Sequence, residues 1–120
     1  MEYLALIYAD ETAWEGFSDD TRNAMYEQYG EFARAAGDAG VLAGGEELGP
    51  TASATTVRLR EGRQLVTDGP YAEAKEALGG YFILDCASLD DALTWAARIP
   101  GASHGAVEVR QVYVDEGATT

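Results

Sequence analysis

The strongest constraint on the fold is an apolar segment at residues 3–9, where the side chains of both alternating sets are hydrophobic. Successive side chains of a β-strand point to opposite faces of a sheet, so a strand that is apolar on both sides must be covered on both. We therefore predict a central strand at residues 3–9. The chain has 120 residues, enough for one hydrophobic core but too few for two, and residues 1–120 are predicted to form a single domain.

Two amphipathic helices are predicted from the spacing of apolar residues and from the residues that precede them. Apolar side chains recur every three or four positions in residues 19–39, and the Ser18 hydroxyl can accept a hydrogen bond from an N–H group at the start of that helix. Gly40 is a suitable residue to end it. Ser88 takes the capping position of a second helix, which Pro100 ends. Residues 10–17 are expected to form a loop.

Further strands follow from alternating or continuous apolar patterns. Residues 53–60 and 63–67 alternate in polarity and are joined by Glu61 and Gly62, which predicts a hairpin with Gly62 at positive φ. The remaining segments are a loop at residues 44–50 and strands at residues 80–86 and 106–114. The order β-α-β-β-β-α-β predicts an α+β fold of the ferredoxin-like split βαβ type with an extra hairpin strand, in which an antiparallel sheet carries two helices on one face.

Two helices can cover only one face of such a sheet, although its central strands are apolar on both faces. An extended apolar face open to water is unusual in a monomeric protein. We therefore predict that the uncovered face meets a second copy of the chain and that the protein is a homodimer.

The charge of the chain limits its partners. With 21 acidic and eight basic side chains the formal net charge is −13, which opposes binding to nucleic acid and to anionic lipid. The longest apolar run is too short to span a bilayer, and Glu2 stands where a secretory signal has basic residues. We expect a cytoplasmic protein that binds neither nucleic acid nor membrane.

Cysteine, histidine and glycine usage bounds the cofactor chemistry. Cys86 and His104 are the only residues of their types, so one chain can form neither an internal disulfide nor a cysteine-histidine zinc site. The glycine pairs lack the spacing of phosphate-binding loops. We predict no cofactor and no metal. His104 could be a general base or a surface residue without a role.

Residues 68–76 are the least generic segment and contain the only lysine of the chain. The segment begins with Asp-Gly-Pro, a strong turn sequence. One interpretation is a turn that simply ends a strand. The other is a rigid turn that presents Asp68, Lys75 and Glu76 to a pocket as catalytic residues, with Lys75 able to lose its proton when desolvated. The tyrosines and arginines expected to bind a ligand in that pocket are Tyr8, Tyr29, Arg58, Tyr71, Tyr81 and Arg110.

Several segments together carry a resemblance to a known family. They are residues 3–8, 54–58, 66–76, 78–81, 92–97 and 107–110. With these segments the chain resembles the DGPF-domain proteins of the YCII-related family, and Tyr71 stands where the name-giving motif has phenylalanine. The resemblance implies a dimeric α+β barrel. It also implies that many members have no assigned activity and that many are associated with extracytoplasmic-function sigma factors.

Some wider relatives in this family resemble isomerases or eliminate chloride from chlorinated hydroxyquinols. The resemblance implies that these enzymes use a histidine on the first helix and an aspartate before the proline that ends the second. The corresponding positions here are Tyr29 and Ile99. A tyrosine with an ordinary pKa of about 10 and an isoleucine cannot supply that base, so the mechanism should not be inherited.

Two hypotheses remain open. The favoured one is a non-catalytic homodimer that binds a small molecule or a protein partner, with a link to sigma-factor signalling. The alternative is a cofactor-independent lyase or isomerase that acts on a small acidic or aromatic-derived substrate. In that enzyme Asp68 or Glu76 would move a proton, and Lys75, Arg58 or Arg110 would stabilise the negative charge of an enolate-like intermediate.

Overall fold

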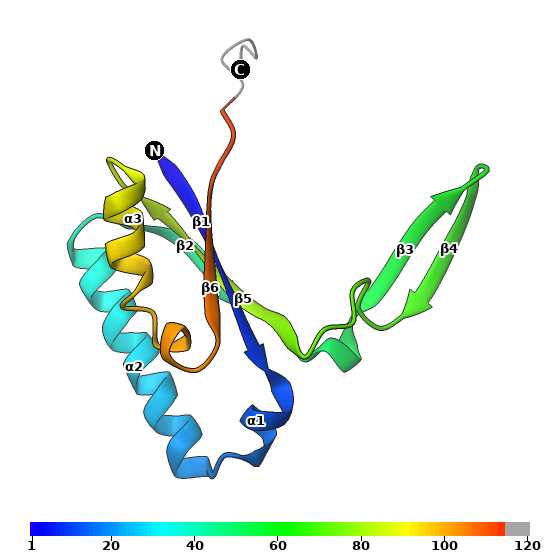
Figure 1. Ribbon diagram of the computed structural model, residues 1–120, viewed down its shortest axis with the longest axis horizontal. Helices are drawn as coiled ribbons and strands as arrows, with labels where there is room; N and C mark the ends of the chain where they lie inside the picture. Colours follow the sequence, from blue (N-terminus) through cyan, green and yellow to red (C-terminus); the bar gives the residue numbers. More distant parts are fainter. Residues whose placement is uncertain (115–120) are drawn as a thin grey trace.

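A computed structural model describes residues 1–114 of the chain (Figure 1). Its elements are β1 (Glu2–Asp10), α1 (Glu11–Gly16), α2 (Asp19–Asp38), β2 (Leu42–Glu47), the short 3₁₀ helix η1 (Thr51–Ser53), β3 (Thr55–Arg60), β4 (Arg63–Asp68), β5 (Glu76–Asp85), α3 (Leu89–Ala96), the 3₁₀ helix η2 (Pro100–Ser103) and β6 (Ala106–Gln111). Four strands form an antiparallel sheet in the order β2-β5-β1-β6, and β3 and β4 form a separate two-stranded sheet.

The α+β fold of the ferredoxin-like type is confirmed. Helices α2 and α3 lie on one face of the four-stranded sheet (Figure 1). The predicted central strand is β1, which pairs with β5 on one side and β6 on the other. The core lies between this sheet and the helices, and its buried residues are Tyr3, Ala5, Ile7, Phe32, Ala36, Leu84, Cys86, Ala92, Ala96 and Ile99.

Both predicted helix starts are confirmed by their capping hydrogen bonds. The Ser18 hydroxyl accepts a hydrogen bond from the Thr21 N–H, and the Ser88 hydroxyl accepts one from the Asp91 N–H. Helix α2 ends before Gly40, whose φ of +72° favours glycine. These boundaries are set by residues next to one another in the chain, which is why the sequence predicts them well.

Two segments predicted as loops are regular structure. Residues 10–17 contain α1, which begins because the Asp10 carboxylate accepts a hydrogen bond from the Thr12 N–H. Residues 44–50 contain most of β2. This strand has two glycines, and because glycine is uncommon in strands, propensity predicts a loop there. A Cβ atom on Gly45 would lie 2.6 Å from the Tyr81 carbonyl oxygen, so glycine is required there by the close approach of β2 to β5.

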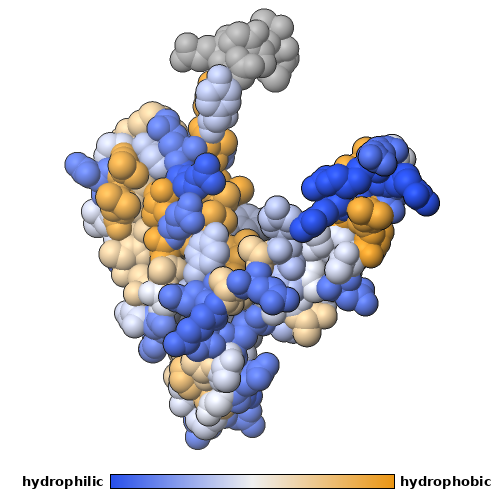
Figure 2. Space-filling model, turned by 45° about the vertical axis from the view of Figure 1, so that its right-hand side comes forward, coloured by the Kyte–Doolittle hydropathy of each residue, from blue (hydrophilic) through white to orange (hydrophobic). Residues whose placement is uncertain are grey.

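The hairpin was predicted as part of the main sheet, and this is wrong. Strands β3 and β4 pair only with each other and project away from the sheet, and all their residues but Thr56 are exposed (Figure 1). Figure 2 shows the hairpin standing out from the body, with hydrophobic and hydrophilic side chains on different sides. The predicted turn geometry holds, since Gly62 has a φ of +75°. No helix among residues 1–114 is long and apolar enough to cross a membrane.

Candidate functional site

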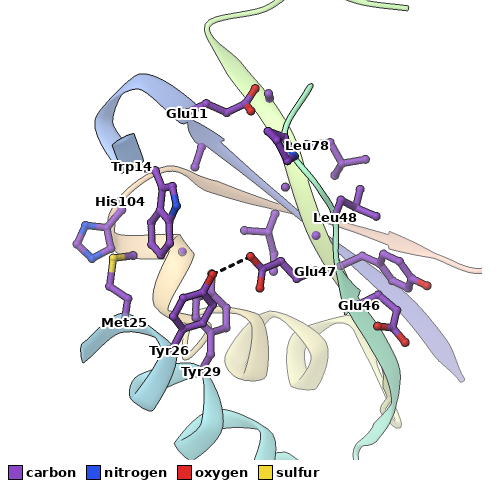
Figure 3. Close-up of a pocket in the computed structure, with 18 of the residues that line it drawn as sticks. Glu11, Trp14, Met25, Tyr26, Tyr29, Glu46, Glu47, Leu48, Leu78 and His104 are labelled. Carbon is purple, nitrogen blue, oxygen red and sulfur yellow. Dashed lines mark hydrogen bonds between the residues drawn. The ribbon is translucent and has the colours of Figure 1, made fainter. Parts of the chain in front are cut away.

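A cavity of about 680 Å³ opens at the end of the sheet where β1 leaves for α1. Its volume is in the range of small-molecule sites. It lies between the middle of α2, helix α1, the end of β2, the start of β5 and the residues around η2 (Figure 3). Its larger apolar and aromatic lining residues are Ile7, Trp14, Met25, Tyr26, Tyr29, Leu48, Leu78, Tyr81 and Phe82.

The cavity exists because α2 is longer than the surface it covers. The helix has 20 residues, and its buried residues Phe32 and Ala36 both lie in its second half, over the sheet. The first half continues past the core, so that Met25 and Tyr26 form a wall of the cavity instead of a packed interface. The adjoining wall is α1, the helix that the sequence did not predict.

Arg22 on α2 holds α1 in place. Its guanidinium donates hydrogen bonds to the backbone oxygens of Trp14 and Glu15, at 3.1 and 2.8 Å, in the last turn of α1. Carbonyl groups at a helix C-terminus attract cations, which makes an arginine a suitable clamp. The Trp14 ring then meets the Tyr26 ring edge-on, with 5.5 Å between centroids.

Glu47 and Tyr26 form the main polar contact of the cavity. The Tyr26 hydroxyl donates a hydrogen bond to Glu47 Oε1 at 3.0 Å (Figure 3), and this bond raises the pKa of Tyr26 above its ordinary value. Neighbouring Glu46 also borders the cavity, but its carboxylate points away from that pair (Figure 3). Side chains alternate along β2, so only one of the two glutamates faces the helices.

Tyr29 lies deeper, at the floor of the cavity. Its ring stacks on Phe82 with 6.3 Å between centroids, and burial raises the pKa of its hydroxyl, an effect that the Gly101 backbone partly opposes. A Cβ atom on Gly101 would lie 2.7 Å from the Tyr29 hydroxyl oxygen, so Gly101 leaves the space that this hydroxyl fills. Tyr29 is therefore a protonated hydroxyl at neutral pH and cannot act as a base there.

The cavity is acidic. Five carboxylate residues line it, whereas no lysine or arginine among residues 1–114 does so. Two of these carboxylates have structural partners, because Asp10 caps α1 and Glu11 accepts hydrogen bonds from the Thr51 N–H and hydroxyl. Glu47 is the carboxylate that faces the aromatic wall. An apolar and aromatic lining with this charge suits a molecule that is uncharged or positively charged.

Of the residues predicted to bind ligand, Tyr29 and Tyr81 border the cavity, although the strand register directs the Tyr81 side chain to the other face of the sheet. The register puts Tyr81 opposite Leu6, and Arg110 opposite Leu4, on the sheet face that carries no helix. Tyr8 belongs to the same alternating set of β1 as Leu4 and Leu6 and does not line the cavity. Arg58 of the hairpin meets Tyr71 of the segment that follows it, with the guanidinium 4.9 Å from the ring centroid.

The predicted catalytic residues Asp68, Lys75 and Glu76 are exposed and lie outside the cavity of this protomer. The turn that begins with Asp68 has the expected geometry, since Gly69 has a φ of +103° and donates its N–H to the Ala54 carbonyl at 2.7 Å. Its contacts are those of a turn that closes the base of the hairpin. A catalytic role for these three side chains stays a prediction.

Trp14, Tyr26 and Glu47 are cavity residues that the sequence reasoning missed. Trp14 lies on the unpredicted helix α1, and Glu47 lies on the unpredicted strand β2. His104, considered before as a base, does line the cavity, on the side of Trp14 and Met25 (Figure 3). Ile99, which the resemblance places at the position of an aspartate, is buried in the core. Residues 1–114 contain no group of three His, Cys, Asp or Glu that could hold a metal ion.

Comparison with known proteins decides the family. The family model of the YCII-related domain matches residues 1–114. The chain belongs to the YCII-related family. This YCII-related protein is 38% identical over 112 residues to an uncharacterized protein of Rhizobium meliloti (strain 1021), covering 92% of the chain and 90% of that protein.

A solved structure supports the fold of this YCII-related protein. It is 5-chloro-2-hydroxyhydroquinone dehydrochlorinase from Burkholderia phenoliruptrix AC1100, in complex with 2,5-dihydroxybenzoquinone. The two chains superpose with a TM-score of 0.53 over 97% of each, at 13% sequence identity. At that identity the likeness establishes a shared fold and not a shared reaction.

Proposed function

We propose that this YCII-related protein binds a small, largely apolar molecule with an aromatic ring, uncharged or positively charged, in the cavity between α1, α2 and β2. The observation that carries the proposal is the lining: aromatic rings form the walls, carboxylates supply the charge, and no lysine or arginine among residues 1–114 lines it. The net charge of −13 adds a repulsion that an anionic ligand would have to overcome.

The proposal narrows the substrate class predicted from the sequence. A small acidic compound would bring a carboxylate next to Glu47, and like charges at about 5 Å oppose each other by about 1–3 kcal/mol at the effective dielectric of a partly exposed site. An aromatic ring fits without that cost. It can lie against Trp14 and Tyr26, whose ring centroids are 5.5 Å apart, and pack on the Tyr29 floor.

Three probes with one framework and different charges test the proposal: tyramine is a cation, tyrosol is neutral and 4-hydroxyphenylacetate is an anion. We expect tyrosol and tyramine to bind with a Kd of roughly 0.1–1 mM and 4-hydroxyphenylacetate to bind about tenfold more weakly. The readout is tryptophan fluorescence of the Trp95→Phe variant, in which Trp14 is the only tryptophan that remains of two.

The matched control is Trp14→Phe, which keeps Trp95, a residue that does not line the cavity. In this variant the fluorescence response to tyramine should disappear, although calorimetry should still detect binding. Equal affinity for all three probes, or tighter binding of 4-hydroxyphenylacetate, would contradict the charge selectivity on which the proposal rests.

The lyase or isomerase alternative is a second candidate because the only histidine of the chain, His104, lines the cavity. It would need a group to stabilise the negative charge that develops when a proton leaves carbon, and the cavity residues offer carboxylates instead. We therefore expect no chloride release from 5-chloro-2-hydroxyhydroquinone above the uncatalysed rate. Chloride release that His104→Ala abolishes would establish the alternative in place of simple binding.

We also propose that the protein is a homodimer whose subunits meet through the sheet face without helices. On that face the register places Leu6 beside Tyr81, and Leu4 beside Ile83. These are the central positions of the sheet, and in one protomer they are only partly covered. A protein partner of the kind the sigma-factor association implies, and a cytoplasmic location, stay predictions.

A further inference from the structure

The hairpin of β3 and β4, residues 55–68 and here named the arm, has two chemically different faces. Its register places Val57 opposite Val66 and Leu59 opposite Gln64, so these side chains share one face. The other face carries Arg58 opposite Leu65, and Arg60 opposite Arg63. The arm is therefore an amphipathic ribbon, with a mainly apolar face and a mainly basic face (Figure 2).

The apolar face of the arm is bare. Val57, Leu59 and Val66 are 62%, 67% and 59% exposed, and no element of the described chain covers them. An isolated two-stranded hairpin is at best marginally stable in water, and a row of exposed apolar side chains on it marks a contact surface. The arm needs a covering partner to be a stable part of the fold.

The arm does not contact the four-stranded sheet of its own chain, and hydrogen bonds close its base. Its base is fixed where the Glu11 carboxylate accepts the Thr51 N–H at 3.0 Å and the Ala54 carbonyl accepts the Gly69 N–H at 2.7 Å. The Thr56 hydroxyl adds a hydrogen bond to the Gly69 carbonyl at 2.8 Å. The contact of Glu11 with Thr51 joins this base to α1, and the ribbon beyond it points away from the sheet (Figure 1).

Charge indicates what covers the arm. Between residues 55 and 68 the chain places three of its eight basic side chains and only Glu61 and Asp68 among its acidic ones. The rest of the chain is strongly acidic, since the total charge is −13. A basic ribbon fits an acidic surface, and another copy of this chain offers one.

The open sheet face carries carboxylates at its two edges, one of which, Glu108, lies 4.0 Å from Arg110 on the same face. One row across the four strands reads Glu46, Tyr81, Leu6 and Glu108, from β2 through β5 and β1 to β6. Its centre is apolar and each edge carries a carboxylate. Long arginine side chains can extend past the edge of a narrow ribbon while its apolar face stays buried, which brings Glu46 and Glu108 within their reach.

We propose that the arm of each protomer lies on the open sheet face of a second copy, with Val57, Leu59 and Val66 against that face and the arginines toward its carboxylates. Each chain has one arm and one open face, so a two-fold exchange covers both surfaces on both copies and leaves no arm for a third. This inference rests on the homodimer proposed above and adds the element that holds it together.

Two matched substitutions on opposite faces of the arm test the inference by sedimentation velocity. Leu59→Thr changes the apolar face, and Leu65→Thr makes the same change on the basic face of the same ribbon. Threonine suits a strand, so the hairpin should persist in both. We expect Leu59→Thr to raise the dimer dissociation constant roughly tenfold or more, because a two-fold dimer loses the apolar contact of this side chain at both arms. Leu65→Thr should change the dissociation constant less than about threefold.

The charge of the arm is tested separately with Arg60→Glu and, as control, Arg34→Glu on α2, which make the same change in net charge at exposed positions. Only Arg60→Glu should raise the dimer dissociation constant, by roughly tenfold or more. A photo-reactive phenylalanine analogue at position 59, in a mixture of unlabelled and heavy-nitrogen-labelled protein, should cross-link to peptides from residues 2–10 or 76–85 of the other copy.

The outcomes separate the two proposals. A wild-type protein that sediments as a monomer at micromolar concentration overturns both the homodimer and the role of the arm. A stable dimer whose dissociation constant is the same for wild type, Leu59→Thr and Arg60→Glu would support the homodimer. It would contradict the proposal that the arm holds the dimer together. Cross-links from position 59 only within one chain also overturn the arm. None of these results depends on ligand binding in the cavity.

Discussion

Replacing Gly105 by alanine should destabilise the protein by about 3 kcal/mol or more and lower its Tm by roughly 10–20 °C. The added Cβ atom would lie 2.1 Å from the Tyr8 carbonyl oxygen and 3.1 Å from the Ala9 Cα atom. Both neighbours are backbone atoms of β1, so no side-chain rotation can relieve the clash. The start of β6 would have to move away from β1, which is the central strand of the sheet. Thermal unfolding followed by circular dichroism measures the effect.

The control for this prediction is Gly37→Ala in helix α2, where the added methyl group meets nothing within 4 Å. Alanine is the better helix residue, and this variant should be more stable than wild type by about 0.5–1 kcal/mol. A Gly105→Ala protein that unfolds at the wild-type temperature would show that β1 and β6 are not held at this close approach. Gly105 follows His104 directly, so the same close approach also sets one side of the cavity.

The sequence predicts those parts of the fold whose cause is local. Ser18 and Ser88 lie next to the helices they cap, and the apolar set of β1 is contained in a single run of residues. Strand β2 has no such local cause. Its glycine Gly45 is required by the backbone of β5, whose Tyr81 is 36 positions away in the chain. A glycine pair gives no sign that it belongs to a strand.

The hairpin shows a different limit. Alternation correctly predicts that residues 55–68 form two paired strands, and Gly62 correctly predicts the turn. Alternation does not say what each face meets, and a strand that is half apolar looks the same in the main sheet and in a projecting arm. Placing the arm requires the hydrogen bonds at its base, which join Glu11 to Thr51 across 40 positions.

The cavity could be predicted only in part for the same reason. Tyr29 and Tyr81 are predicted from the sequence to bind ligand, and both border the cavity. Tyr26 and Glu47 are 21 positions apart, and their contact depends on β2 being a strand and on Glu47 facing the helices. Trp14 depends on α1, which Arg22 holds in place through two backbone carbonyls. No local pattern contains these long-range contacts.

Replacing Glu47 by lysine should reverse the charge preference of the cavity. Glu47 is the carboxylate that faces the aromatic wall, where Tyr26 donates it a hydrogen bond at 3.0 Å. A lysine there would attract 4-hydroxyphenylacetate and repel tyramine. Because the charge at position 47 changes sign for both probes, the ratio of their affinities should change by about a hundredfold. Titration of both probes in the Trp95→Phe background, followed by Trp14 fluorescence, measures the ratio.

The neighbouring residue provides the control that makes this prediction specific. Glu46→Lys changes the net charge by the same amount on the same strand, but its side chain points away from Tyr26 (Figure 3). Bulk electrostatics alone would make the two variants equal, whereas a site at Glu47 requires the change in preference to be at least about tenfold larger in Glu47→Lys. Glu47→Gln should lie between wild type and Glu47→Lys, because it removes the charge without inverting it. An unchanged affinity ratio in Glu47→Lys would place the ligand elsewhere on the protein.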